Sequence, residues 1–581
     1  MSFIKKSVPV LLALSTTLTL AADQIDAASS SSASSISGAA SKELASQKSA
    51  AKQTAAGYEV EQPDTSRPLY EDYSKINDNK AKYVFQFIGD GMGVTPVTAA
   101  EQYAGKVETG KIEPKFTNFT EFPVVGLQNP YDCHSFIPDS ASTATAYANG
   151  VKTQTDTVGM NGDLDKATDS VAEKAHRAGK KVGIITSVTL NHATPAGFYA
   201  NVQNRNSYYD IGLQMAKTDF DYFAGGSLVD RTGTDGKQKD LYTVMKENGY
   251  TIADTKAKFN NVSAKTGKVY AISERLQDEG SMPYAMDTRQ GDQTLADFVQ
   301  KGIDVMKDDK DGFFMMVESG KIDWAEHAND AKATITEVNA FQDSINKAIE
   351  FYNEHPDETL IVVTADHATG GFTIGNTETG YETYYDLLEA QKESYVEFDN
   401  RLAAMKEKKP NLTLEDVTPL IKQSFGLKLD PNVKEEIMTF AEREALKINE
   451  NKVDTSGLSG EMKKVAEKQN KDAAASKKDP YLLTESEYHE MGAAFKETMK
   501  APEDRIDSQE TLVRYGGYEP LTITATRILN KKAGLAWTTV EHTGEKIPVY
   551  AIGASAKMFD GHFDNTDIAI RLNAAMDQTN K

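Results

Sequence analysis

Short, continuous hydrophobic runs alternate with amphipathic segments from Tyr83 to about Asn376. Strands that bury both faces are predicted by the runs at 83–88, 182–186, 220–224, 313–317 and 360–364, and helices by the segments 169–178, 294–306 and 335–353. Strands that alternate with helices in this way indicate βαβ units. We therefore expect an α/β fold with a large, mainly parallel central sheet flanked by helices.

The pattern changes between residues 381 and 515, where long charged runs such as 433–444 and 461–471 favour partly solvated helices. This segment is predicted to be a charged, mainly helical insertion. The strand pattern returns at 548–553, so we expect residues 516–581 to complete the α/β core that residues 69–380 begin.

The first 21 residues are typical of a secretory signal peptide, with Lys5 and Lys6 before an apolar stretch that ends near Ala21. That stretch is shorter than a membrane span requires. We therefore expect an exported protein, periplasmic or extracellular, without a membrane-spanning segment. Residues 22–68 are rich in Ser and Ala and predict a largely disordered leader.

Acidic residues outnumber basic ones by 86 to 64, which gives a formal net charge of −22. This charge argues against a protein that binds nucleic acid through general phosphate attraction, although an acidic surface also serves solubility alone. A site for an anionic ligand would need its own positive potential, which metal ions supply. Cys133 is the only cysteine, so no intrachain disulfide is possible, and we expect a packing residue or an exposed thiol.

Three of the hydrophobic runs lead directly into an acid, namely Asp90, Glu318 and Asp366. In an open α/β sheet, ligands gather beyond the carboxyl ends of the strands. We therefore expect these three carboxylates to form one acidic rim.

Histidines lie close to that rim in the sequence. Asp323 and His327 are four residues apart, so both can reach one metal ion from the same face of a helical turn. Read alone, this pair also fits an ordinary surface ion pair. His367 follows Asp366 directly, and His542 could complete the set. Imidazole and carboxylate ligands suit zinc.

A serine, Ser140, stands at the predicted start of a small-residue helix. Asp139 fits the N-cap, and the free N–H groups of a helix start favour a bound phosphate. Further along, Thr194 offers an oxygen ligand, and Arg205 offers a planar fork for two phosphate oxygens. Each segment also has a structural interpretation: a capped helix with incidental hydroxyls, a helix cap at Thr194 and a surface charge at Arg205.

In this order the segments resemble the alkaline phosphatase family of secreted bacterial and animal enzymes. The resemblance runs from about Tyr83 to Leu572, apart from the charged insertion. Its most specific part is Asp-Ser-Ala-Ser-Thr-Ala-Thr-Ala at 139–146 followed by Gly-Val-Lys-Thr at 150–153. The segments Asp-Gly-Met-Gly at 90–93, Thr-Ala-Asp-His at 364–367 and Glu-His-Thr-Gly at 541–544 recur in the expected order.

The resemblance implies two zinc ions and one magnesium ion per chain. The implied ligands are Asp323, His327 and His542 for the first zinc; Asp90, Asp366 and His367 for the second zinc, with Ser140 as the exchangeable ligand; and Asp90, Thr194 and Glu318 for magnesium. Oxygen ligands alone favour magnesium, and sites with histidine favour zinc, so the chemistry of the donors agrees with this assignment.

The implied activity is the hydrolysis of phosphate monoesters by a homodimer, through a covalent phosphoserine on Ser140, with Arg205 clamping the phosphate. Two positions vary among relatives: His192 stands where some bacterial members carry aspartate, and Trp324 where others carry lysine or histidine. We expect Asp139, His192 and Trp324 to lie just behind the ligands. The last two would tune metal affinity and product release without being needed for the chemistry.

Other functions remain open at this point. Phosphodiesterases, phosphopentomutases and cofactor-independent phosphoglycerate mutases use a related metal pair, whereas the motif that a sulfatase needs is missing around Cys133 and Ser135. A secreted protein that binds phosphate or metal without catalysis is an alternative of another class. The segment 308–312 resembles part of a calcium loop but lacks the remaining spacing, so we expect a turn there.

Overall fold

The fold is organised around one large sheet. The computed structural model describes residues 76–433, 460, 463–464, 479–505 and 508–577. The main sheet has 11 strands. Its strands in spatial order are β15 (Gly561–Asp564), β3 (Val124–Asn129), β14 (Ile547–Ala554), β9 (Thr359–Ala365), β2 (Tyr83–Gly89), β8 (Phe313–Ser319), β4 (Lys181–Thr186), β5 (Tyr222–Gly225), β7 (Val269–Ile272) and β6 (Thr251–Ala253), with β1 (Ile76–Asn77) beside β14.

The sheet is mainly parallel, as predicted. Only β14 runs against its neighbours β3 and β9, because the chain returns to the sheet late and enters it from the opposite end. Two small antiparallel ribbons lie outside the main sheet: β10 (Ala368–Thr369) with β13 (His542–Thr543), and β11 (Thr373–Ile374) with β12 (Leu535–Ala536).

Successive residues of the central strands point to opposite faces and feed two separate hydrophobic cores. Phe85 and Phe87 of β2 belong to one core, and Val84 and Ile88 to the other. Both sets are completely buried, which explains why these strands appear in the sequence as unbroken hydrophobic runs.

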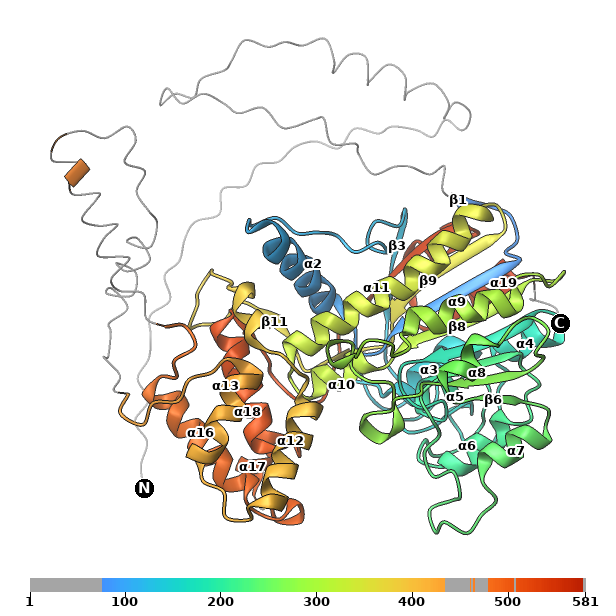
Figure 1. The fold of residues 1–581 in the computed structure, drawn as a ribbon. Helices are drawn as coiled ribbons and strands as arrows, with labels where there is room; N and C mark the ends of the chain where they lie inside the picture. The colour runs from blue at the N-terminus through green and yellow to red at the C-terminus, as the bar shows by residue number, and fades with distance from the viewer. Residues whose placement is uncertain (1–75, 434–459, 461–462, 465–478, 506–507, 578–581) are drawn as a thin grey trace, which may run out of the picture. The chain divides into compact units, whose positions relative to one another are not determined.

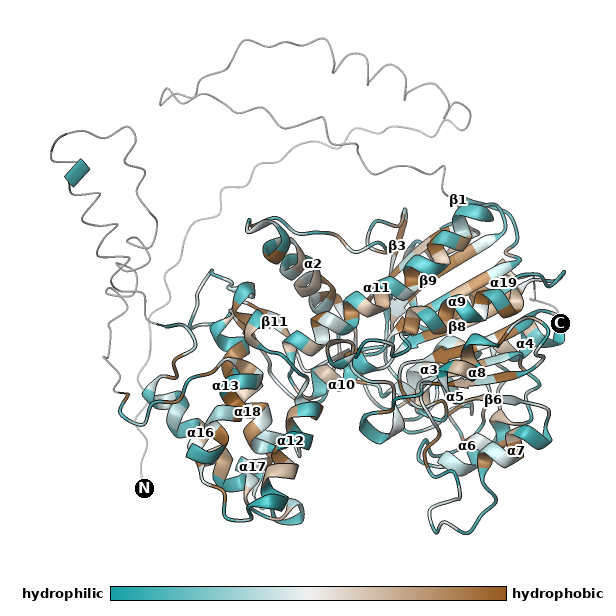
Figure 2. Ribbon diagram, viewed as in Figure 1, coloured by the Kyte–Doolittle hydropathy of each residue, from teal (hydrophilic) through white to brown (hydrophobic). Residues whose placement is uncertain are grey.

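Helices cover both faces of the sheet (Figure 1). The first core is covered by α2 (Val94–Thr109), α9 (Leu295–Met306) and α11 (Ala331–Glu354). The second core is covered by α3 (Ser140–Asn149), α4 (Val171–Arg177), α5 (Ala193–Ala196), α6 (Tyr208–Met215), α7 (Leu241–Glu247) and α19 (Thr566–Ala575). Figure 2 shows hydrophobic colours along the central strands and hydrophilic stretches on the surrounding helices, which is the pattern of a buried sheet between two helical layers.

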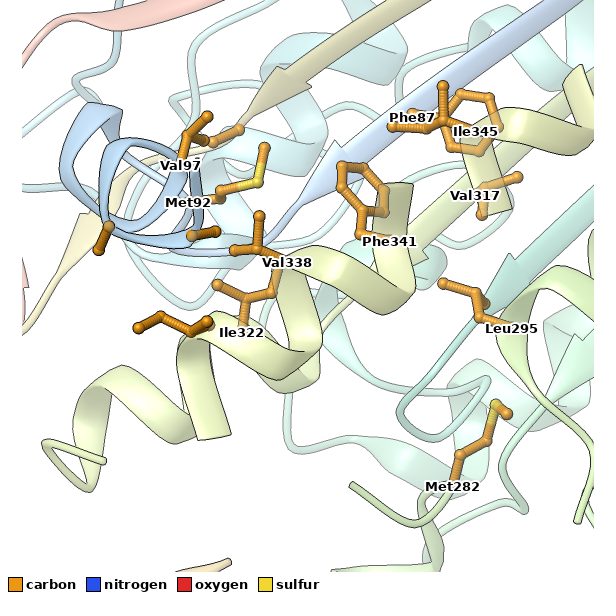
Figure 3. Close-up of a cluster of buried hydrophobic side chains, with 14 of the residues drawn as sticks. Phe87, Met92, Val97, Met282, Leu295, Val317, Ile322, Val338, Phe341 and Ile345 are labelled. Atoms are coloured by element: carbon orange, nitrogen blue, oxygen red, sulfur yellow. The ribbon is translucent and has the colours of Figure 1, made fainter. Parts of the chain in front are cut away.

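Aromatic and aliphatic side chains of α11 fill the first core (Figure 3). Phe341 packs edge-on against Phe87 of β2 and against Phe119, with ring centroids 5.8 and 6.2 Å apart. Val338 and Ile345 flank Phe341 on the same face of the helix. This packing holds α11 across β2 and β8, the two strands that carry Asp90 and Glu318 at their ends.

The described part of the segment 381–515 is mainly helical. It contains α12 (Tyr395–Lys408), α13 (Leu414–Phe425), α16 (Glu485–Thr498) and α17 (Gln509–Tyr515), and α18 (Pro520–Lys532) follows it. The five helices form one group in which α18 contacts each of the others (Figure 1). Phe398 and Phe425 of this group continue the first core, so the segment is packed onto the sheet domain rather than detached from it.

The predicted strands and helices are confirmed with small shifts. The third predicted helix, α11, begins four residues earlier than predicted, because Asp330 caps it by accepting a hydrogen bond from the amide of Ala333. Five strands of the main sheet were missed, namely β1, β3, β6, β7 and β15. In β3 the inward positions include Gly126 and the buried amide Gln128, which weaken the apolar alternation. The segment 308–312 is the turn that was predicted.

Several predictions fall on residues outside the described part of the chain: the signal peptide at 1–21, the leader at 22–68 and most of the charged runs at 433–444 and 461–471. Cys133 is an exposed thiol, one of the two predicted states. None of the helices in the described residues combines the length and the apolar character that a membrane span requires.

Truncation of the central ring of the first core tests this packing. We expect Phe341→Ala to destabilise the protein by about 3–5 kcal/mol, because it removes a buried aromatic side chain and leaves a cavity. The midpoint of urea unfolding should fall accordingly. Phe136→Ala is the matched control, since that ring is 87% exposed and its loss should leave the midpoint nearly unchanged. Equal midpoints for the two variants would contradict the packing described here.

Candidate active site

The register of three parallel strands brings the predicted acidic rim together. β2 lies between β8 and β9, with Gly89 opposite both Ser319 and Ala365. Asp90 and Asp366 therefore leave their strands at the same level, and Glu318, which lies opposite Ile88, is two residues before that level. All three side chains are completely buried.

The first cluster consists of Asp323, His327 and His542. Asp323 and His327 lie on the short helix α10 (Lys321–His327), with Nε2 of His327 3.2 Å from Oδ2 of Asp323. His542 arrives from far along the chain because β13 pairs with β10, where it faces Thr369. Its Nε2 lies 3.2 Å from Nε2 of His327. One ligand atom from each of the three residues lies within 4.8 Å of the others, which is close enough for one shared metal ion.

The second cluster forms around His367. Its Nε2 lies 3.4 Å from Oδ1 of Asp90, 3.2 Å from Oδ2 of Asp366 and 3.2 Å from Oγ of Ser140. Asp323 also reaches Asp90 and His367, with ligand atoms within 4.8 Å. It thus lies between the two clusters, a bridging position that the sequence did not indicate.

The third group contains only oxygen donors. Oγ1 of Thr194 lies 3.4 Å from Oδ2 of Asp90, and Thr186 donates a 2.5 Å hydrogen bond to Oε2 of Glu318. Thr194 is buried inside α5 and does not cap it, because His192 occupies the N-cap. The interpretation of Thr194 as a helix cap is therefore wrong.

Ser140 begins helix α3, directly after its cap. Oδ1 of Asp139 accepts a hydrogen bond from the amide of Ser142, as an N-cap does. Oδ2 of Asp139 pairs with Nη1 of Arg205 at 2.9 Å, and the arginine side chain is only 17% exposed. The interpretation of Arg205 as a surface charge is therefore wrong as well.

His192 and Trp324 lie beside Arg205. Nη2 of Arg205 is 3.3 Å from Nε2 of His192, and because a guanidinium only donates, this nitrogen accepts. Burial, together with the charge of Arg205, lowers the pKa of His192 to about 3, so its ring is neutral. The rings of His192 and Trp324 meet edge to face at 5.8 Å. His192 thus fixes the direction of the arginine fork.

These residues surround one cleft of about 410 Å³. Its lining consists of Ser140, His192, Arg205, Asp278, Glu279, Asp323, Trp324, His327, Tyr395, Tyr518 and His542. Four of them, Asp278, Glu279, Tyr395 and Tyr518, were not predicted from the sequence.

Burial of so many acids strongly disturbs their protonation. Burial, and then the charge of Asp366, raise the pKa of Asp90 well above its usual value. Burial raises the pKa of Glu318 to about 7, and burial together with the charge of Asp323 raises that of Asp366 to about 6. The pKa of Asp323 is lowered instead of raised. Burial opposes its ionisation, but His327, His542 and His367 hold its pKa below the usual range. The carboxylates therefore need a positive partner to be ionised together.

Comparison with known proteins settles the family. The family model of alkaline phosphatases matches residues 81–578, which is most of the chain. The chain belongs to the alkaline phosphatase family. It is accordingly a phosphoric monoester hydrolase, and enzymes of this family depend on metal ions.

Curated relatives and solved structures agree with this family. Alkaline phosphatase 3 of Bacillus subtilis strain 168 is 27% identical over 508 residues, which cover 86% of this chain and 90% of that protein. The human tissue-nonspecific alkaline phosphatase is 30% identical over 52% of this chain and 66% of the human protein. The alkaline phosphatases of a Shewanella species and of Thermus thermophilus share the fold at TM-scores of 0.62 and 0.65, with 24% and 21% identity. The alignments cover 85% of this chain and 99% of the Shewanella chain, and 90% of this chain and 97% of the Thermus chain.

The residues at the rim fit the metal ions of an alkaline phosphatase. Oδ1 of Asp90 and Oε1 of Glu318 are buried and have no hydrogen-bond partner among the described residues. An unpartnered buried carboxylate oxygen is costly, and a divalent cation is the partner that satisfies several at once. The two histidine-containing clusters have donors that suit zinc, and the oxygen-only group has donors that suit magnesium.

The missed residues had weak signals or none. Thr143 donates to Oδ2 of Asp366 at 3.1 Å, and its spacing of three from Ser140 on a helix would have placed it on the same face. Tyr395 and Tyr518 come from the helical segment and the loop after it, and no local pattern distinguishes them from core aromatics.

The pKa shifts predict how the metal-free enzyme depends on pH. Glu318 and Asp366 have folded-state pKa values of about 7 and about 6, whereas the unfolded values lie near 4. Protonation therefore stabilises the folded state, and this stability is lost as the pH rises through about 6 to 7. We expect the thermal midpoint of the chelator-treated protein to fall between about pH 5 and pH 8. Glu318→Gln should flatten this dependence, and the exposed control Glu354→Gln should leave it as in the wild type; a wild-type midpoint that rises with pH would contradict the shifts.

Proposed function

We propose that the enzyme hydrolyses phosphate monoesters through a covalent phosphoserine on Ser140 and carries two zinc ions and one magnesium ion per chain. The observation that carries this proposal is the position of Ser140, whose Oγ faces the cleft 3.2 Å from Nε2 of His367 while Arg205 lines the same cleft. A nucleophile, an anion clamp and two ligand clusters thus meet around one cavity.

Each metal has a set of residues that would hold it. Asp323, His327 and His542 would hold the first zinc; Asp90, Asp366 and His367 the second; and Asp90, Thr194 and Glu318 the magnesium. When bound, these ions supply Lewis acidity and positive charge for the phosphoryl group and for the attacking and leaving oxygens. In a solved structure of the relative named TAB5 alkaline phosphatase, a mutant has Mg bound in its M3 site.

The chain's own residues position the substrate. Arg205 would hold two oxygens of the phosphoryl group, since its fork is aligned by Asp139 and His192. The first amides of α3 add hydrogen-bond donors on the same side. Oγ of Ser140 then forms a bond to phosphorus as the bond to the ester oxygen breaks, and the alcohol leaves with a proton. Water hydrolyses the phosphoserine, which releases phosphate and restores the hydroxyl.

Two alternatives are less well supported. A phosphodiesterase would need space for a second ester group beside the phosphate, where Arg205 and His192 already lie. A binding protein without catalysis would not need a hydroxyl at the start of α3 directed at His367. Export through residues 1–21 and assembly into a homodimer remain predictions from the sequence and the family.

Trapping of labelled phosphate tests the nucleophile. We expect label from a phosphate monoester, after acid quenching, on the peptide that contains Ser140. Ser140→Ala should abolish the label and lower kcat/KM by a factor of about a thousand or more, because the covalent step is lost. Ser142→Ala is the matched control two residues away in α3, since its hydroxyl donates only to the carbonyl of Asp139. Equal labelling of wild type and Ser140→Ala would contradict the proposal.

Replacement of the two variable positions tests their supporting role. We expect His192→Ala and Trp324→Ala to keep a phosphoserine burst, because neither side chain touches Ser140. Both should change the steady-state rate and the affinity for magnesium, since His192 orients Arg205 and is the N-cap residue of α5, the helix that carries Thr194. Rapid-quench kinetics and metal analysis measure the two effects. Complete loss of the burst with all metals still bound would show that either residue is needed for the chemistry.

A further inference from the structure

The cleft has a second half that the proposed chemistry does not use. Trp324, Tyr395 and Tyr518 line it with aromatic rings, and Asp278 and Glu279 line it with carboxylates. Asp323 connects the two halves, because it is the neighbour of Trp324 in the chain and lines the same cleft as Tyr518. The second half therefore lies on the side of the first-zinc cluster, where the alcohol of a substrate would leave.

The aromatic wall is held rigidly. The rings of Tyr395 and Tyr518 meet edge to face, with centroids 6.1 Å apart. The hydroxyl of Tyr284 donates to that of Tyr395 at 3.0 Å, which in turn donates to Oδ2 of Asp278 at 3.4 Å. Rings fixed in this way present preformed surfaces to a ligand, so little conformational entropy is lost on binding.

A cation already lies behind this wall. Nζ of Lys321 is completely buried, 3.7 Å from the ring centroid of Tyr284 and 5.0 Å from that of Trp324. It also lies 3.6 Å from Oδ2 of Asp278. The aromatic residues thus stabilise positive charge from the inside, and Lys321 balances the charge of Asp278. Glu279 is therefore the carboxylate in this half of the cleft whose negative charge is not balanced by a neighbouring cation among the described residues.

The backbone holds Glu279 in an unusual conformation. Asp278, Glu279 and Gly280 have successive positive φ values of 26°, 52° and 86°. Non-glycine residues rarely adopt this region, and such strain is concentrated at functional positions. Ser281 secures the turn by donating from Oγ to the carbonyl of Asp278 at 2.7 Å. Glu279 is exposed, and no ion pair joins it to another described residue.

We propose, on the basis of the proposed function, that this half of the cleft binds the cationic end of a phosphate monoester of an amino or quaternary-ammonium alcohol. Aromatic faces and a nearby carboxylate are the groups that recognise an onium ion. The phosphate end of such a substrate faces Arg205, and its positive end faces Tyr518 and Glu279. A cleft that is positive at one end and negative at the other matches a zwitterion, and it repels alcohols that carry further negative charge.

Phosphocholine and its neutral isostere, 3,3-dimethylbutyl phosphate, are the probes. The metal-loaded full-length enzyme is assayed with both, and the ratio of their kcat/KM values is determined. Because the ammonium group also makes choline a better leaving group, the ratio in one enzyme mixes reactivity with recognition. The change of the ratio between wild type and variant cancels the reactivity and isolates recognition.

Two variants remove the two kinds of contact. We expect Tyr518→Leu to lower the ratio about fivefold, the effect of one exposed cation–π contact of about 1 kcal/mol. Glu279→Gln should lower it about threefold at low ionic strength, and less at high salt, since the carboxylate is exposed. Tyr381→Leu and Glu382→Gln are matched controls, because neither residue lines the cleft and Tyr381 is fully exposed. The controls should keep the wild-type ratio.

A ratio unchanged in both Tyr518→Leu and Glu279→Gln would overturn this proposal. Binding of choline, compared with 3,3-dimethyl-1-butanol, is measured separately through the fluorescence of the protein's two tryptophans. Quenching by choline alone supports the cation site even without turnover. Absence of turnover of p-nitrophenyl phosphate would overturn the proposed function instead, so the two failures are distinguishable.

Discussion

Repulsion between buried carboxylates is the constraint on which the rest of the site depends. The pairing of β2 with β8 and β9 brings Asp90, Glu318 and Asp366 to one edge of the sheet, with no exposure to water. Hydrophobic burial of the strands, not any attraction among the acids, enforces this approach. The acids can be ionised together only if positive charge enters among them, so the fold itself creates the demand for metal ions.

Strand pairing between segments far apart in the chain also completes the site. Asp323 and His327 are supplied locally by α10, but the third member of their cluster comes from residue 542, after the whole helical segment. The two-residue ribbon of β13 with β10 and the antiparallel insertion of β14 beside β9 bring it back. His542 is held further by the contact of its Nδ1 with the carbonyl of Pro138, directly before Asp139 and Ser140. The proposed nucleophile Ser140 and the late histidine are thus positioned by the same short stretch of backbone.

Local patterns were sufficient for the central strands of the sheet and for most of the candidate ligands, because each strand-end acid follows a run of buried residues that is visible in the sequence. Local patterns were insufficient for residues whose position in the site depends on tertiary packing. Asp323 bridges two clusters only because α10 packs against α11 and β10, and strand β3 buries Gln128 instead of an apolar residue. Tyr395 and Tyr518 reach the cleft through helix packing, and their sequence neighbourhoods resemble those of any core tyrosine. His542 was a candidate from its sequence context, but only the resemblance to the family assigned it to the cluster of Asp323, because no spacing connects the two.

The two halves of the cleft are built by different parts of the chain, and this has a physical consequence. The chemistry-bearing half is formed by strand ends and short helices of the sheet domain, whose positions are fixed by the register of the sheet. The aromatic half draws Tyr395 from α12 and Tyr518 from the loop before α18, so its shape depends on how the helical group packs. Under the proposed function, changes in that group would alter which alcohol fits without moving a residue of the two ligand clusters. The topology would then separate the chemistry from the selection of the leaving group, since a sheet edge tolerates little displacement and a helical insertion tolerates much more.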